Sequence, residues 1–134
     1  MFSAMLLAIS ILALSQFAIY YGRAVFTGVA AQPVSERVLQ AAAMQDRCLT
    51  GEDFPKFAEL HDLTPYLQPG GDGLGLVRHY YSVVRKLGQL AGAGMPMVSE
   101  WSARESLICA QYAAVKVDRR MQANLALAAS MRSC

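Results

Sequence analysis

The first 22 residues of the chain contain no Asp, Glu, Lys, Arg or His, and this apolar run constrains the fold more than any other feature. Residues 2–21 read FSAMLLAISILALSQFAIYY. At about 1.5 Å per residue, twenty helical residues cover the roughly 30 Å hydrocarbon core of a bilayer. Backbone amides in lipid need internal hydrogen-bond partners, so a single segment crosses only as a helix. The sequence therefore predicts a transmembrane anchor with its juxtamembrane continuation in residues 1–31.

The residues that flank this span predict its ends and its orientation. Tyr20 and Tyr21 stand where an aromatic belt is expected, and Arg23 follows where a guanidinium reaches the lipid headgroups. No basic residue precedes the span, whereas Arg23 and Arg37 follow it. Basic residues favour the cytoplasmic side of a membrane. We therefore expect a single-pass membrane protein whose soluble helical domain, residues 32–134, is cytoplasmic.

Two other interpretations of the apolar run stay open. Val29, Ala30 and Ala31 offer a small-residue cleavage site, so the run could be a secretory signal, which would leave a secreted or periplasmic helical binding domain. Against this, the run has no basic n-region and is longer than the usual apolar region of about 7–15 residues. A buried core helix of a soluble bundle is the third interpretation, but twenty residues without a polar stripe are unusual there.

Beyond residue 31 the apolar residues recur at helical intervals, and no segment shows the period-two alternation of a strand. Ser35 and Asp53 are candidate N-caps, and further helices are expected from Leu74 and from Met97. The helix from Leu74 has one predicted apolar face: Leu74, Val77, Tyr80, Tyr81, Val84 and Leu87. The last helix has an alanine-rich face and a charged stretch that we expect in solvent: Lys116, Asp118, Arg119 and Arg120. The sequence predicts an all-α fold, one transmembrane helix followed by a three- or four-helix bundle.

A search for catalytic and metal-binding patterns finds none. The cysteines Cys48, Cys109 and Cys134 are widely spaced, and neither His61 nor His79 belongs to an H-E-x-x-H or C-x-x-C pattern. The glycine-rich stretch QPGGDG lacks the P-loop lysine and is expected to be a connector. We predict no catalytic residue, metal or cofactor. A small membrane-bound enzyme that uses His61 or Cys48 remains the alternative.

The charged residues suggest a lipid or protein partner rather than a nucleic acid. The chain has 12 Lys and Arg against 10 Asp and Glu, with no run of five like charges and no aromatic residues interleaved among the basic ones. Arg78, Arg85 and Lys86 share the polar side of one helix and are candidate contacts for anionic headgroups or a partner. We therefore expect a non-catalytic membrane-anchored accessory or protein-interaction subunit, with the bilayer and a protein partner or second copy as its contacts.

Overall fold

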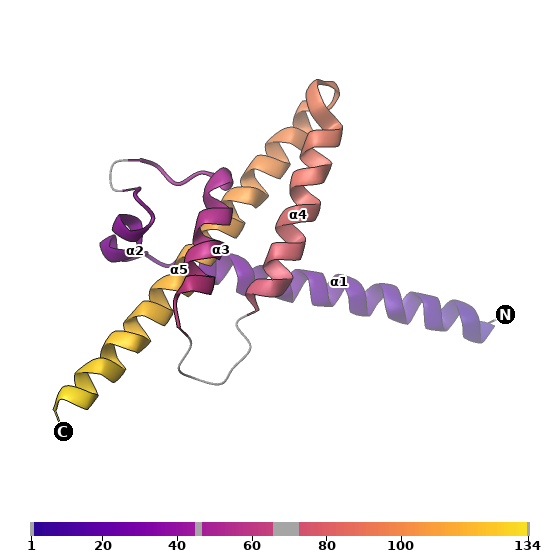
Figure 1. Cartoon of the computed structure of the whole chain (residues 1–134). Helices are drawn as coiled ribbons and strands as arrows, with labels where there is room; N and C mark the ends of the chain where they lie inside the picture. Colours follow the sequence, from indigo (N-terminus) through magenta and orange to yellow (C-terminus); the bar gives the residue numbers. More distant parts are fainter. Residues whose placement is uncertain (1, 45–46, 66–72, 134) are drawn as a thin grey trace.

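The computed structural model describes residues 2–44, 47–65 and 73–133, and all regular structure in these ranges is helical (Figure 1). The helices are α1 (Phe2–Ala30), α2 (Glu36–Ala41), α3 (Phe54–Leu63), α4 (Leu74–Ala91) and α5 (Pro96–Arg132), with 3-10 turns η1 (Gly51–Asp53) and η2 (Gly92–Gly94). The predicted all-α fold, a long apolar N-terminal helix followed by a helical bundle, is confirmed. The predicted glycine-rich connector lies almost entirely in residues 68–72, outside the described residues.

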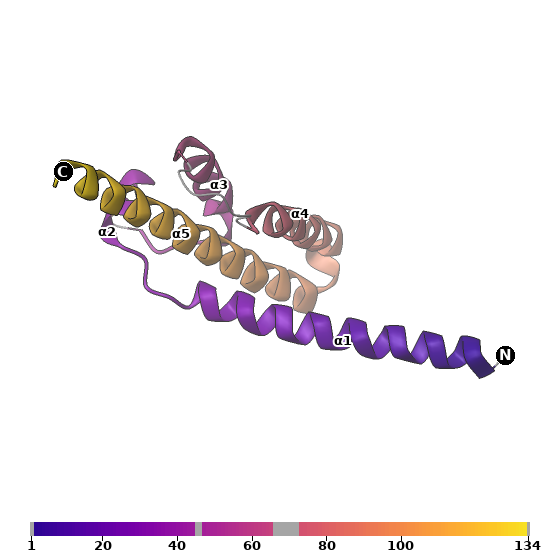
Figure 2. The same ribbon diagram turned by 90° about the horizontal axis from the view of Figure 1, so that it is seen from below.

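Helix α5 is the spine of the bundle, and α1, α2, α3 and α4 all pack against it. Figures 1 and 2 show α4 beside the first half of α5, while α1 crosses α5 on another side. The face of α5 in the core carries small side chains, which let the neighbouring helices approach closely. They are Cys109, Ala110, Ala113, Ala114 and Val117. Larger apolar residues from the other elements fill the space around them, among them Val38, Phe54, Phe57, Val77 and Tyr81.

Buried polar residues of α5 join it to the other elements. The Ser102 hydroxyl donates to the Val84 carbonyl of α4 at 3.0 Å. Asp118 accepts hydrogen bonds from the backbone N–H of Ser35 at 3.3 Å and from the Ser35 hydroxyl. Our expectation that Asp118 faces solvent is therefore wrong, because it is only 6% exposed. Its partner lies 83 residues earlier in the chain, which local periodicity does not reveal.

The start of α3 combines two N-terminal signals that compete in the sequence. The Asp53 carboxylate accepts from the Thr50 N–H at 2.9 Å and from the Thr50 hydroxyl at 2.7 Å, and this capping box spans the 3-10 turn η1. Helix α3 begins only after Asp53, so Pro55 lies in its first turn, where a missing N–H costs nothing. Burial raises the pKa of Asp53, but hydrogen bonds from Thr50 and Lys56 and the charge of Arg47 outweigh it and lower the pKa to about 2.

Helix α1 is 29 residues long and has two different environments. Residues 2–25 are all exposed, and the N-terminal part projects far beyond the bundle in both views (Figures 1 and 2). Phe26 and Thr27 are half-buried and Ala30 is 6% exposed. Among the described helices, α1 is the one long and apolar enough to cross a membrane, a property that signal sequences share.

Candidate functional site

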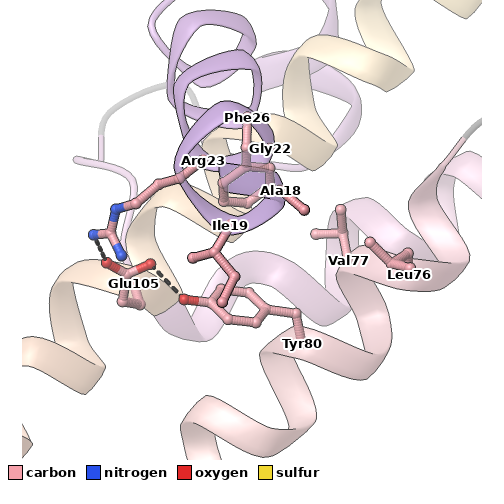
Figure 3. A pocket seen from close by; sticks show the side chains of 9 residues that line it. All are labelled: Ala18, Ile19, Gly22, Arg23, Phe26, Leu76, Val77, Tyr80 and Glu105. Carbon is pink, nitrogen blue, oxygen red and sulfur yellow. Dashed lines mark hydrogen bonds and ion pairs between the residues drawn. The ribbon is translucent and has the colours of Figure 1, made fainter. Parts of the chain in front are cut away.

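The candidate site lies where α1 meets α4 and α5, and a three-residue polar network marks it (Figure 3). Glu105 of α5 is 3% exposed and forms an ion pair with the guanidinium of Arg23 on α1. Its second oxygen accepts a hydrogen bond of 2.8 Å from the Tyr80 hydroxyl of α4. The Arg23 side chain is 51% exposed, so the network runs from the protein interior to its surface. One carboxylate thus connects three helices.

The chemistry of this network is that of a fixed structural contact. Burial, together with the neighbouring Glu105, raises the pKa of Tyr80 to about 12. The phenol therefore keeps its proton at neutral pH and donates to the carboxylate, while Arg23 supplies the compensating positive charge. A buried carboxylate without such partners carries a large desolvation penalty. Arg23 and Tyr80 consequently hold α1 at a defined position on the bundle.

An aromatic cluster extends the same contact along α1. The centroid of the Phe26 ring lies 4.9 Å from the ring centroid of Tyr112 on α5 and 6.2 Å from that of Tyr80. The Phe26–Tyr80 pair has an edge-on geometry. The Lys116 ammonium lies 5.5 Å from the centroid of the Tyr112 ring. Such aromatic pairs contribute about 0.5–1.5 kcal/mol beyond the area they bury. Phe26 therefore anchors the last turns of α1 in the bundle.

A groove of about 330 Å³ lies beside the polar network, between α1 and α4 (Figure 3). Its α1 wall consists of Ala18, Ile19, Gly22 and Phe26, and its α4 wall consists of Leu76, Val77 and Tyr80. Arg23 and Glu105 form its charged end. The apolar walls suit a hydrocarbon chain or an apolar side chain, and they begin where the exposed part of α1 leaves the bundle.

The residues of α1 that the sequence predicts at the membrane interface lie between Ala18 and Phe26, the two ends of the α1 wall of the groove. Tyr20 and Tyr21 are 73% and 55% exposed. The centroids of the Tyr21 and Phe17 rings are 4.3 Å apart. Arg23 contacts Glu105 instead of extending away from the protein, although half of its side chain remains exposed. The structure thus gives Arg23 a structural partner that the sequence pattern did not predict.

The predicted basic residues of α4 have separate surroundings. Arg78 donates to the Ala58 carbonyl at 2.9 Å and forms an ion pair of 2.7 Å with Asp62, and its hydrogen bond lowers the pKa of that carboxyl group. Arg85 donates to the Tyr81 hydroxyl at 2.8 Å. Lys86 is exposed. Two of the three predicted cations are thus engaged with the bundle.

The histidine and cysteines considered for the enzyme alternative have different environments. His61 is 7% exposed, and Arg120 donates to its carbonyl at 2.8 Å and contacts its ring nitrogens at 3.0 and 3.1 Å. Cys48 is exposed, whereas Cys109 is buried in the core, where burial raises the pKa of its thiol to about 12. Cys134 lies outside the described residues. Within those residues, no group of three His, Cys, Asp or Glu side chains is placed to hold a metal.

Sequence reasoning missed Glu105, the central residue of the network. A signal for it exists, because Glu105 lies at helical spacing between Trp101, Ile108 and Tyr112, an otherwise apolar strip. A single carboxylate in such a strip needs a cation, and Arg23 is the first basic residue after the apolar run.

Comparisons of the chain with protein-family models, with curated proteins and with solved structures find no match.

Proposed function

We propose that this chain is a single-pass membrane protein in which α1 anchors a cytoplasmic helical domain, and that it acts as a non-catalytic accessory or protein-interaction subunit. One observation carries this proposal. Helix α1 is apolar and wholly exposed through Gly22, and the same unbroken helix then joins the bundle through Arg23 and Phe26. An exposed apolar helix of this length is unfavourable in water and favourable in a bilayer.

The contacts of residues 23–30 favour a retained anchor over a cleaved signal. Cleavage after Ala31 would remove Arg23 and leave Glu105 buried without its cation. It would also remove Phe26 and expose the rings of Tyr80 and Tyr112. A segment that completes the core of the domain is a structural part of the protein, whereas a signal peptide is discarded.

The direct connection between anchor and bundle supports a role in interaction. Because α1 is one continuous helix from Phe2 to Ala30, no flexible linker separates the membrane segment from the domain. The bundle is therefore held at a fixed orientation next to the membrane. Ala18 and Gly22 form a small-xxx-small pair in the wall of the open groove beside α4, and a partner's transmembrane helix that enters this groove can pack closely on α1. A second copy or a membrane-embedded partner subunit fits this arrangement.

Purification of the full chain from membranes in a mild detergent, followed by intact and native mass measurement, tests the proposal. We expect the mass of the chain with its N-terminal helix retained, and a native mass that shows a homo-oligomer or a stoichiometric partner. Loss of about 31 residues would establish the secreted alternative instead. A full-length monomer that stays monomeric in both membranes and detergent would contradict the interaction role.

The same cells report the side of the membrane on which the domain lies. In a Cys134→Ser variant, the exposed Cys48 serves as the target of a membrane-impermeant maleimide. We expect Cys48 to react only after lysis, because the domain is cytoplasmic. Reaction in intact cells would place the domain outside and overturn the predicted orientation.

A further inference from the structure

Helix α4 has further apolar residues that the bundle leaves mostly exposed, apart from the half-buried Tyr80. These residues follow one another at intervals of four and three, so they form a single stripe along the helix. They are Leu76, Tyr80, Val83, Leu87 and Leu90. Leu76 and Leu90 at its two ends are 80% and 84% exposed, and Val83 and Leu87 between them are 48% and 44% exposed. The buried residues of α4, which are Leu74, Val77, Tyr81 and Val84, lie beside this stripe on the helix.

This α4 stripe is continuous with the apolar surface of α1. Leu76 and Tyr80, the first two residues of the stripe, line the same groove as Ala18, Ile19 and Gly22 of α1 (Figure 3). The stripe therefore begins where the predicted membrane span leaves the bundle. Figure 1 shows α4 lying across the direction of α1 rather than along it, as a helix at a membrane surface would lie beside a spanning one.

Trp101 of α5 lies on the same side of the α4–α5 pair. It precedes Glu105 by one helical turn, and Glu105 accepts the hydrogen bond from Tyr80 of the stripe. The two helices join through the short turn η2, and the Ser102 hydroxyl donates to the Val84 carbonyl, so the preceding residue Trp101 lies level with the second half of α4. Its side chain is 38% exposed. Tryptophan is enriched at the boundary between lipid and water.

The polar residues along one border of the stripe complement an anionic membrane surface. His79 and Lys86 fall between successive stripe residues on the helix, and both are exposed. Arg78 and Arg85 are on the other side, where Asp62 and Tyr81 engage them. An apolar stripe bordered by a cation is the pattern of a helix that lies in the interface plane of a bilayer. A cation close to anionic lipid contributes about 1 kcal/mol.

We infer that the α4 stripe and Trp101 lie in the headgroup–acyl boundary of the leaflet that α1 enters, so that the bundle rests on the membrane. The occupant of this surface is the lipid bilayer itself. The inference deepens the proposed function and rests on the membrane anchor proposed above. The sequence predicted lipid contacts on the basic face of α4, whereas the lipid contact inferred here is on the exposed apolar face of the same helix.

Trp101 is the single tryptophan of the chain and so provides a native probe for this contact. The full chain is reconstituted in vesicles of phosphatidylcholine and phosphatidylglycerol, with or without bromine on the upper acyl carbons of the phosphatidylcholine. We expect the brominated lipid to remove about half of the Trp101 emission, because the ring lies at the depth of the bromine atoms. The Leu87→Glu/Leu90→Glu variant should lose most of this quenching.

The matched control is Leu63→Glu/Leu125→Glu, two exposed leucines on α3 and α5 outside the stripe, and it should keep the quenching of the unmodified chain. Circular dichroism of both variants verifies that the helices are retained. Wild-type emission that brominated lipid leaves unchanged would overturn the inference. So would a disulfide that an added oxidant forms between two copies of a Leu90→Cys variant, because the occupant would then be a second copy.

Alkaline extraction of the same vesicles separates the two possible failures. A chain that stays with the vesicles but is not quenched contradicts the lipid contact of α4 alone. A chain that alkali releases contradicts the anchor, and the inference fails with it.

Discussion

Replacing Arg23 with methionine is expected to lower the free energy of unfolding of the domain by about 2–3 kcal/mol. The substitution leaves the Glu105 carboxylate, which is 3% exposed, without its counter-ion. The Tyr80 hydroxyl still donates to it but carries no charge. Because Arg23 is half exposed, the loss should be smaller than for a fully buried pair. Denaturant unfolding of the full chain in detergent micelles, followed by Trp101 fluorescence, measures the change.

Two further variants separate the ion pair from a general effect of losing an arginine. Arg104 is an exposed residue next to Glu105 in the sequence, and Arg104→Met should change the stability by less than about 0.5 kcal/mol. Adding Glu105→Gln to Arg23→Met should recover more than half of the loss, since the neutral amide needs no counter-ion. Equal stabilities for Arg23→Met and Arg104→Met would mean that the pair does not hold α1 on the bundle.

The fold class and the long N-terminal helix could be predicted because their signals are local. The predicted anchor with its juxtamembrane continuation ends at residue 31, before Pro33, and α1 ends at Ala30. The signals at Thr50, Asp53 and Pro55 are also local, although a capping box that begins at Thr50 would place Pro55 beyond the first turn of one helix. The structure accommodates both because a 3-10 turn carries the capping box before the α-helix begins.

The surface of α4 illustrates what periodicity leaves undetermined. Leu74, Val77 and Tyr81 are buried as predicted, whereas Leu87 from the same predicted face is 44% exposed. The apolar positions of α4 form one wide arc, and the sequence does not say how much of that arc the neighbouring helices cover.

The candidate site could not be assembled from sequence because its contacts are long-range. Arg23 and Glu105 are separated by 82 residues, and neither belongs to a recognisable motif. The sequence placed Arg23 correctly at the end of the apolar run but gave it only lipid headgroups as partners. Which acidic residue meets it depends on how α1 crosses α5, and that crossing is a property of the packed bundle.

Two glycines of α4 are expected to respond in opposite directions to the same substitution. Gly88→Ala should destabilise the domain by about 1–3 kcal/mol, because a Cβ there would lie 2.8 Å from the Cβ of Ser102 and 2.2 Å from its hydroxyl oxygen. The Ser102 hydroxyl is not free to turn away without losing its hydrogen bond to the Val84 carbonyl. Gly75→Ala should stabilise the domain by about 0.5–1 kcal/mol, because nothing lies within 4 Å of its Cβ position and alanine favours the helix.

Both substitutions add one methyl group within α4 and replace glycine by a better helix former, Gly75 in the first turn and Gly88 in the interior. The difference between their unfolding free energies, measured in detergent micelles, therefore reports the steric cost of separating α4 from α5 at Ser102. A Gly88→Ala variant as stable as Gly75→Ala would show that the two helices do not approach closely there. In that case the other contacts of α4, among them the hydrogen bond of Tyr80 and the ion pair of Arg78, would have to set the orientation of the helix, and with it the direction of its exposed apolar stripe.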